Sequence, residues 1–215
     1  MKIGCVFTQR GLDSQGRPQR DPDSTSYVAA IEGTERFGRR LYAEAFKRGV
    51  QQAQEAVVLG DGAAWIWNLA AEHFPQATQI VDVYHARQHL YELRDLVDPG
   101  QLQHWLQCLE EGAIEQILQS LAAQKADLAE DAEFLRQQRV YFENNAHRMG
   151  YAQLRSRGLF VGSGVVEAAC RTVIAQRLKR SGMFWTRQGA NQVLALRTNL
   201  KSGHWENFWE SRTLN

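Results

Sequence analysis

Short apolar runs alternate with amphipathic stretches over the first 84 residues of the chain. Four runs are typical of β-strands: KIGCVFT (2–8), TSYVAAIEG (25–33), EAVVLGD (55–61) and TQIVD (78–82). The polar residues 9–24, rich in Gly, Pro and Asp, are typical of an exposed hairpin loop. Residues 34–49 and 62–74 repeat apolar positions at helical spacing, and we expect Thr34 to cap the first helix. This order predicts an α/β layer in which 57–60 and 78–81 pair in parallel.

The pattern becomes entirely helical after residue 84. Four amphipathic stretches follow without a strand: 85–97, 100–112, 113–128 and 132–149. We therefore expect a helical insertion at 85–150 between a first core part, 1–84, and a second, 151–215. In the second part VVEAACRTVIAQRLKR (165–180) predicts a helix buried over most of its surface, with Cys170 inside and Glu167 close to the core.

Composition and charge narrow the class of protein. The chain is 44% hydrophobic and 23% charged, which is ordinary for a globular protein. No run approaches the roughly 18–20 apolar residues of a membrane helix, and the N-terminus does not resemble a secretory signal, so we expect a cytoplasmic protein. The net charge of +1 hides an acid-free stretch from Ala168 to Trp205, called the basic segment below, which is suited to a polyanion.

Acidic residues stand at the ends of the predicted parallel strands. Asp61 follows one and Asp82 the other, and loops at the carboxyl ends of parallel strands converge on the same edge of a sheet. Each aspartate also suits the N-cap of the next helix. Glu167 is distant in sequence and lies near the start of the basic helix. It either stabilises that helix by interacting with the helix dipole or binds a divalent metal together with Asp61.

The combined motifs resemble those of a known enzyme family. GDGAAWIWNLAAEHFPQATQIVDVYHARQHL (60–90), a helical stretch and then GSGVVEAACRTVIAQRLKRSGMFWTRQGANQVLALR (162–197) are similar to bacterial insertion-sequence transposases of the DDE type. The similar branch has an Asp-x-x-His signature after its second catalytic aspartate and a helical insertion before its glutamate. The likeness covers nearly the whole chain.

The resemblance implies a fold, a reaction and roles for particular residues. The fold would be an α/β RNase H-like core of strand order 3-2-1-4-5, with the all-helical insertion. Asp61 and Glu167 would be catalytic residues and ligands in a two-ion Mg²⁺ (or Mn²⁺) site, and Asp82 with His85 would shape that site. The reaction would be phosphodiester hydrolysis and strand transfer on transposon ends and target DNA, by a nucleoid-associated enzyme that is a homo-oligomer when intact.

The chain departs from the family where the first catalytic aspartate should stand. That residue belongs to strand 1, upstream of the segment similar to KIGCVFT, and Met1 occupies that place here. We therefore expect a transposase fragment, truncated at the N-terminus, that neither cleaves nor joins DNA alone. Without strand 1, the strands at 2–8 and 55–60 should keep unpaired edges, which favour association.

DNA contact is expected from the basic segment, and two other functions stay open. The residues expected to contact phosphates and bases are Arg171, Arg177, Lys179, Arg180, Trp185 and Arg187, with Phe184 as a second stacking candidate. One alternative is a non-catalytic DNA-binding remnant that modulates an intact transposase. The other is a zinc-dependent hydrolase that uses Asp82, His85 and His89.

Overall fold

Three pairs of short strands account for the strand pairing in the computed structural model, which describes residues 1–125 and 128–213. Strand β1 (Lys2–Val6) pairs antiparallel with β4 (Ser26–Ala30), and β5 (Val57–Gly60) pairs in parallel with β6 (Thr78–Val81). The parallel pairing predicted from sequence is confirmed. The expected hairpin loop itself contains a small antiparallel pair, β2 (Gln9–Leu12) and β3 (Pro18–Arg20).

The two main strand pairs have an unusual distribution of burial. Each residue of β1 is half-buried, whereas Val28, Ala29 and Ala30 of its partner β4 are buried. In the same way β5 is half-buried or exposed, while Ile80 and Val81 of β6 are fully buried. Neither β1 nor β5 has a second described strand beside it. The expectation that these two strands have unpaired edges therefore agrees with the observed pairing.

Helices α1 (Thr34–Lys47) and α2 (Ala64–His73) pack against each other and join the two strand pairs. Phe37 of α1 and Leu69 of α2 share a buried cluster with Val28 of β4. The expected Thr34 cap is wrong by one residue, because the N-cap is Gly33, which has no side chain to bond the helix. The helix begins without a side-chain cap and is held by its packing instead.

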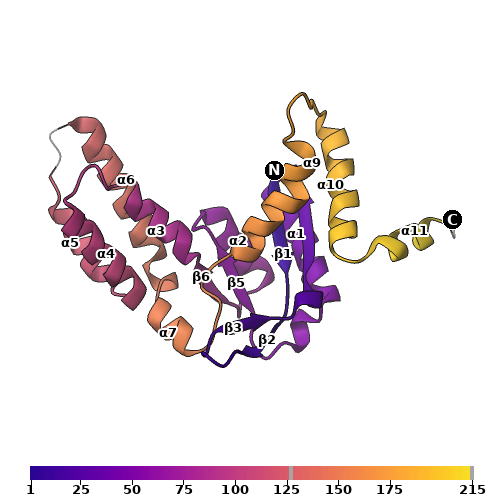
Figure 1. Cartoon of the computed structure of the whole chain (residues 1–215), viewed down its shortest axis with the longest axis horizontal. Coiled ribbons are helices and arrows are strands. Elements are labelled where there is room, and N and C mark those ends of the chain that lie inside the picture. Colours follow the sequence, from indigo (N-terminus) through magenta and orange to yellow (C-terminus); the bar gives the residue numbers. More distant parts are fainter. Residues whose placement is uncertain (126–127, 214–215) are drawn as a thin grey trace.

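The helical insertion has a continuous apolar core. Its helices are α3 (Val83–Tyr91), α4 (Pro99–Glu111), α5 (Ile114–Ala123) and α6 (Ala129–Asn145), and the turn η3 (Ala146–Arg148) follows. Trp105 of α4 and Phe142 of α6 are both 0% exposed and belong to the same core cluster as Ile80 and Val81 of β6. The insertion is thus packed directly onto the parallel strand pair, and it lies on the left of Figure 1.

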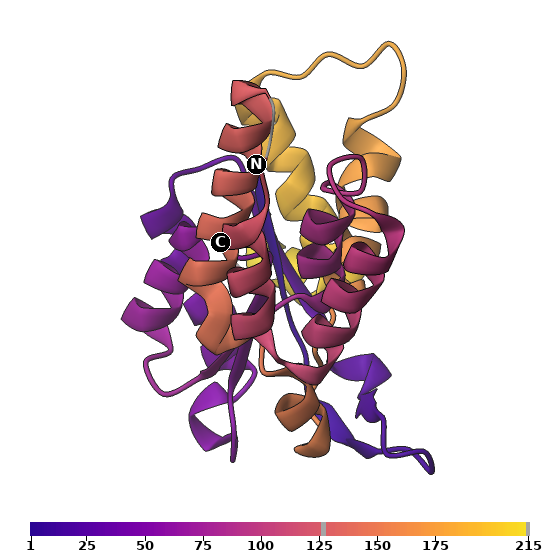
Figure 2. The same ribbon diagram turned by 90° about the vertical axis from the view of Figure 1, so that its left-hand side faces the viewer.

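The C-terminal helices return to the other side of the strands. Short α7 (Tyr151–Ser156) precedes an unbroken helical stretch made of α8 (Gly164–Ala169), a π-helical part η4 (Cys170–Ala175) and α9 (Gln176–Leu178). After a loop come α10 (Arg187–Lys201) and α11 (Trp205–Thr213). Figures 1 and 2 show α10 on the side of the strands opposite to the insertion.

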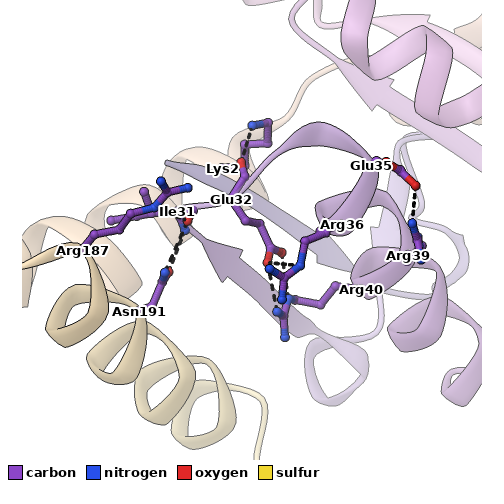
Figure 3. A network of polar contacts seen from close by, with 9 residues as sticks. All are labelled: Lys2, Ile31, Glu32, Glu35, Arg36, Arg39, Arg40, Arg187 and Asn191. Carbon is purple, nitrogen blue, oxygen red and sulfur yellow. Dashed lines mark hydrogen bonds and ion pairs between the residues drawn. The ribbon is translucent and has the colours of Figure 1, made fainter.

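Helix α10 is fastened to β4 through main-chain groups at the end of that strand. The Asn191 carboxamide accepts a hydrogen bond from the Ile31 backbone N–H at 2.7 Å, and Arg187 donates to the Ile31 carbonyl at 3.2 Å (Figure 3). Next to them Glu32 accepts two hydrogen bonds from Arg40, which lower the pKa of that carboxyl (Figure 3). The start of α10 is therefore fixed in position relative to β4.

Among the described residues we find no helix with both the length and the apolar character needed to cross a membrane.

Candidate functional site

Asp61 ends the parallel strand β5 and has an accessible carboxylate. Its side chain is exposed, and one oxygen accepts a hydrogen bond from the Ala63 backbone N–H at 2.9 Å. The next residue, Gly62, has a φ of +99°, and a Cβ there would lie 2.6 Å from the Tyr141 ring. The turn after β5 therefore requires glycine, and it presents Asp61 to solvent without making it the N-cap of α2, which is Ala63.

Asp82, at the end of β6, is a buried capping residue. It is 2% exposed and accepts hydrogen bonds from the backbone N–H groups of Tyr84, His85 and Ser163, at 2.7, 3.2 and 2.6 Å. Three donors satisfy most of its acceptor capacity, so burial of this carboxylate is tolerated. The N-cap role considered for Asp82 is confirmed, while the same role is wrong for Asp61.

Asp82 also joins the start of the glutamate helix to the ends of the parallel strands. The Asp82 backbone N–H donates to the carbonyl of Gly60, the residue before Asp61, at 2.7 Å. Its carboxylate binds Ser163, the N-cap residue of α8. Glu167 follows in the first turn of α8. The chain segments that carry Asp61 and Glu167 therefore both meet Asp82 at the carboxyl end of the β5–β6 pair.

Two expectations about the glutamate helix are wrong. The sequence pattern places Glu167 close to the core and Cys170 inside it, but both side chains are exposed. They lie three residues apart and so share one helical face, whereas Ala169 and Val173 (both 0% exposed) face the protein. Exposure leaves the Glu167 carboxylate available to an ion or ligand from solvent.

The helical insertion contributes residues to this site that the sequence did not indicate. Tyr141 of α6 donates its hydroxyl to the Asp61 carbonyl at 3.1 Å. Asn145, one turn later and 3% exposed, accepts from the Trp67 indole at 2.9 Å and donates to the Gly62 carbonyl at 3.4 Å. The turn at 60–62 is thus held by two side chains of α6. Their spacing of four residues predicts that they share one face of the helix. The spacing does not predict that this face contacts the 60–62 turn.

His89 belongs to α3 of the insertion and contacts α6 next to this turn. Its ring stacks on Tyr141 with centroids 3.7 Å apart, and its Nδ1 lies 2.7 Å from the Gln138 carboxamide oxygen. Burial lowers the pKa of His89. Burial raises the pKa of Tyr141, and the nearby carboxylates of Asp61 and Asp82 raise the pKa of Tyr141 further. At neutral pH, His89 is therefore neutral and Tyr141 is a hydrogen-bond donor.

The geometry does not favour a zinc site formed by Asp82, His85 and His89. His85 and His89 rings are 5.2 Å apart, but Asp82 is occupied by three backbone donors. No cluster of three or more His, Cys, Asp or Glu side chains suited to a metal ion occurs in the described ranges. Asp61 and Glu167 are two oxygen donors of the kind that Mg²⁺ prefers.

The basic segment presents most of its cations to solvent. The exposed members of the predicted DNA-binding set are Arg171, Arg177, Lys179, Arg180 and Arg187. Within the described part of the chain, none of these five lies within ion-pair distance of a carboxylate. Trp185 is half-buried, and the Arg177 guanidinium lies over its ring, with Cζ 5.6 Å from the ring centroid. Phe184 is 97% exposed.

Comparison with known proteins identifies a family for most of the chain. No curated protein and no solved structure matches the chain. Residues 37–212 match a family model, and this range includes the parallel strand pair, the insertion, the glutamate helix and the basic segment. The chain belongs to the Uncharacterised protein family (UPF0236).

Proposed function

We propose that this chain is the catalytic part of a DDE-type transposase with an RNase H-like core, and that Asp61 and Glu167 are its metal ligands. The observation that carries the proposal is the junction at Asp82, where the segments bearing these two acids meet at the carboxyl end of a parallel strand pair. Both carboxylates are exposed, so a hydrated cation and a DNA phosphate have access to them. Bound Mg²⁺ would neutralise phosphate charge and polarise the scissile bond.

The strand arrangement supports the RNase H-like part of the proposal. In the 3-2-1-4-5 order, β4 and β1 correspond to strands 3 and 2, an antiparallel pair, and β5 and β6 to the parallel strands 4 and 5. The outer strands contain buried residues (four of five in β4, and Ile80 and Val81 in β6), whereas no residue of the inner strands β1 and β5 is buried. Inner strands of a continuous sheet are usually the most covered. An additional strand between β1 and β5 would reverse this distribution and would carry the third acid.

The residues around the two acids have distinct tasks in this proposal. Tyr141 and Asn145 hold the turn that presents Asp61, and Asp82 fixes the start of α8 that presents Glu167. His85 lies beside the site as a shaping residue. The cations of the basic segment would bind the DNA backbone, since phosphate contacts supply most of the sequence-independent affinity of DNA-binding proteins. Transposon ends and target DNA are the proposed partners, bound by a homo-oligomer.

A Mn²⁺ titration tests the metal assignment. We expect calorimetry with a short DNA duplex present to show weaker Mn²⁺ binding in Asp61→Asn and in Glu167→Gln. The control is Asp95→Asn, which removes a carboxylate that is 82% exposed and pairs only with Arg94 among the described residues. Equal affinity in all four proteins would contradict the proposal. Stoichiometric zinc that is lost in His85→Gln would favour a zinc hydrolase instead.

A nicking assay tests the need for a third acid. We expect residues 1–215 alone to leave supercoiled plasmid intact in Mg²⁺ or Mn²⁺, because the described residues provide no group of three metal-binding side chains. Metal-dependent nicking that disappears in Asp61→Ala would show that two acids are sufficient. A protein that binds DNA, binds no Mn²⁺ and never cleaves would favour the second candidate, a non-catalytic modulator that uses only the basic segment.

A further inference from the structure

The loop between α9 and α10, residues 179–186, holds an aromatic side chain almost completely in solvent. Phe184 is 97% exposed, the highest value among the exposed large hydrophobic residues that the structure describes. The loop projects beyond the neighbouring helices in both Figure 1 and Figure 2, where it is the orange loop at the top. A single exposed aromatic side chain is common on protein surfaces, so the significance of Phe184 depends on the groups that surround it.

The residues on both sides of Phe184 make contacts within the protein, and these contacts position the loop that carries the Phe184 ring. Met183 precedes it and lies with its sulfur 3.8 Å from the Arg177 guanidinium, which also covers the Trp185 ring. Thr186 caps α10 by accepting a hydrogen bond from the Gly189 backbone N–H at 3.0 Å. Trp185 is therefore a supporting residue of the loop, and Phe184 is the side chain that points away from it.

The charges around Phe184 indicate the chemistry of the partner. Arg177, Lys179 and Arg180 are exposed and lie within seven residues before Phe184, and no acid occurs between Ala168 and Trp205. An exposed aromatic ring beside several exposed cations suits a ligand that alternates flat aromatic groups with phosphates. Single-stranded nucleic acid has this chemistry, whereas in duplex DNA both faces of each base are already stacked.

We infer that Phe184 stacks on an unpaired DNA base while the neighbouring cations bind the adjacent phosphates. This inference rests on the proposed function, in which the basic segment binds DNA. It narrows the substrate to DNA with locally unpaired or extruded bases, and it assigns the stacking to Phe184 in place of Trp185.

The test uses an oligonucleotide with one 2-aminopurine, whose fluorescence falls when an aromatic ring stacks on it. We expect the full chain to quench a single-stranded probe and Phe184→Ala to lose both the quenching and about 5- to 150-fold in affinity, the range for removal of one base–aromatic stack. Phe184→Trp should restore both. Phe46→Ala is the matched control, because Phe46 is also exposed, at 52%, and lies on α1.

The possible outcomes distinguish failure of base stacking by Phe184 from failure of the proposed DNA binding by the basic segment. Salt-dependent binding of duplex DNA that is equal in wild type and Phe184→Ala, with no change at the single-stranded probe, would overturn the inference and leave the proposed function intact. Absence of any DNA binding by the wild type would overturn both. An equal loss in Phe46→Ala, or binding of anionic vesicles through Phe184 without quenching of the probe, would also contradict stacking on a base.

Discussion

The helical insertion and the basic segment use arginine in opposite ways. In the insertion, Arg136 and Arg139 pair with Glu133 and Glu143 on the same helix, each at 2.7 Å. In the basic segment, Arg177 and Arg180 contact a methionine sulfur, an aromatic ring and a backbone carbonyl, but no described carboxylate. These two arginines of the insertion are therefore paired with acids of their own helix. The positive charge of Arg177 and Arg180 is not neutralised by a carboxylate of the described residues.

The two regions also differ in the burial of their aromatic side chains. Phe142 of the insertion is 0% exposed within a large core, whereas Phe184 of the basic segment is 97% exposed. The core beneath α10 is small and consists of Val173, Ile174, Leu194 and Ala29 with a few half-buried neighbours. The insertion therefore has a large core and holds the 60–62 turn through Tyr141 and Asn145, whereas the basic segment has a small core and would supply the DNA-binding surface of the proposed function.

The largest expected effect comes from making the same substitution in both regions. Phe142→Ala should lower the free energy of unfolding by about 3–5 kcal/mol, because it leaves a cavity in the core. Phe184→Ala should change it by less than about 0.5 kcal/mol, as is usual for exposed positions. Urea denaturation of the two variants measures the difference. Similar decreases in the two variants would mean that the loop packs against the protein.

Charge removal should separate the regions by DNA affinity. The triple variant Arg177→Gln, Lys179→Gln, Arg180→Gln should weaken duplex binding and reduce the slope of log affinity against log salt by up to about 0.9 for each phosphate that is no longer neutralised. The double variant Arg136→Gln, Arg139→Gln removes cations that are paired inside the insertion, so it should leave the slope unchanged. Fluorescence anisotropy at several salt concentrations measures both. A larger effect in the double variant would place the DNA on the insertion.

Removal of the Tyr141 hydroxyl should loosen the turn that presents Asp61. Tyr141→Phe removes the hydrogen bond to the Asp61 carbonyl, which should cost about 0.5–1.5 kcal/mol of stability and speed amide exchange at Gly62 and Ala63. Tyr91→Phe on the exposed side of α3 is the control. Equal exchange rates in Tyr141→Phe and wild type would show that α6 does not hold this turn.

The smallest expected effect is a pH dependence from His89. Burial lowers the pKa of this histidine in the folded protein, so the unfolded chain takes up the proton at higher pH, near the usual value of about 6.5. Stability should therefore fall as pH drops below that value, and the decrease should level off once folded His89 is itself protonated. His85, Glu92, Asp61 and Gln138 are the groups that modify this titration. Thermal melts from pH 7.5 to 5 should be flatter in His89→Gln, and an unchanged profile would contradict this assignment.

Most elements were predictable from local pattern, but the details of the site depend on distant contacts. The parallel pairing of 57–60 with 78–81 follows from two short apolar runs joined by a helix. The exposure of Glu167 was missed because the run VVEAAC offers five uncharged neighbours, and the pattern did not reveal which face meets the protein. The π-helical residues 170–175 add to this difficulty, since the wider turn shifts the faces of a helix relative to α-helical spacing.

The central claim is that Asp61 and Glu167 belong to one divalent-metal site, and Fe²⁺-directed cleavage of the protein tests it most directly. Iron that replaces Mg²⁺ generates hydroxyl radicals in the presence of ascorbate and peroxide, and these cut the nearest backbone. We predict fragments that end near residues 60–62 and also near 163–167, and the disappearance of both sets in Asp61→Asn and in Glu167→Gln. Cleavage confined to the neighbourhood of His85 and His89, or cuts that persist in both variants, would contradict the claim.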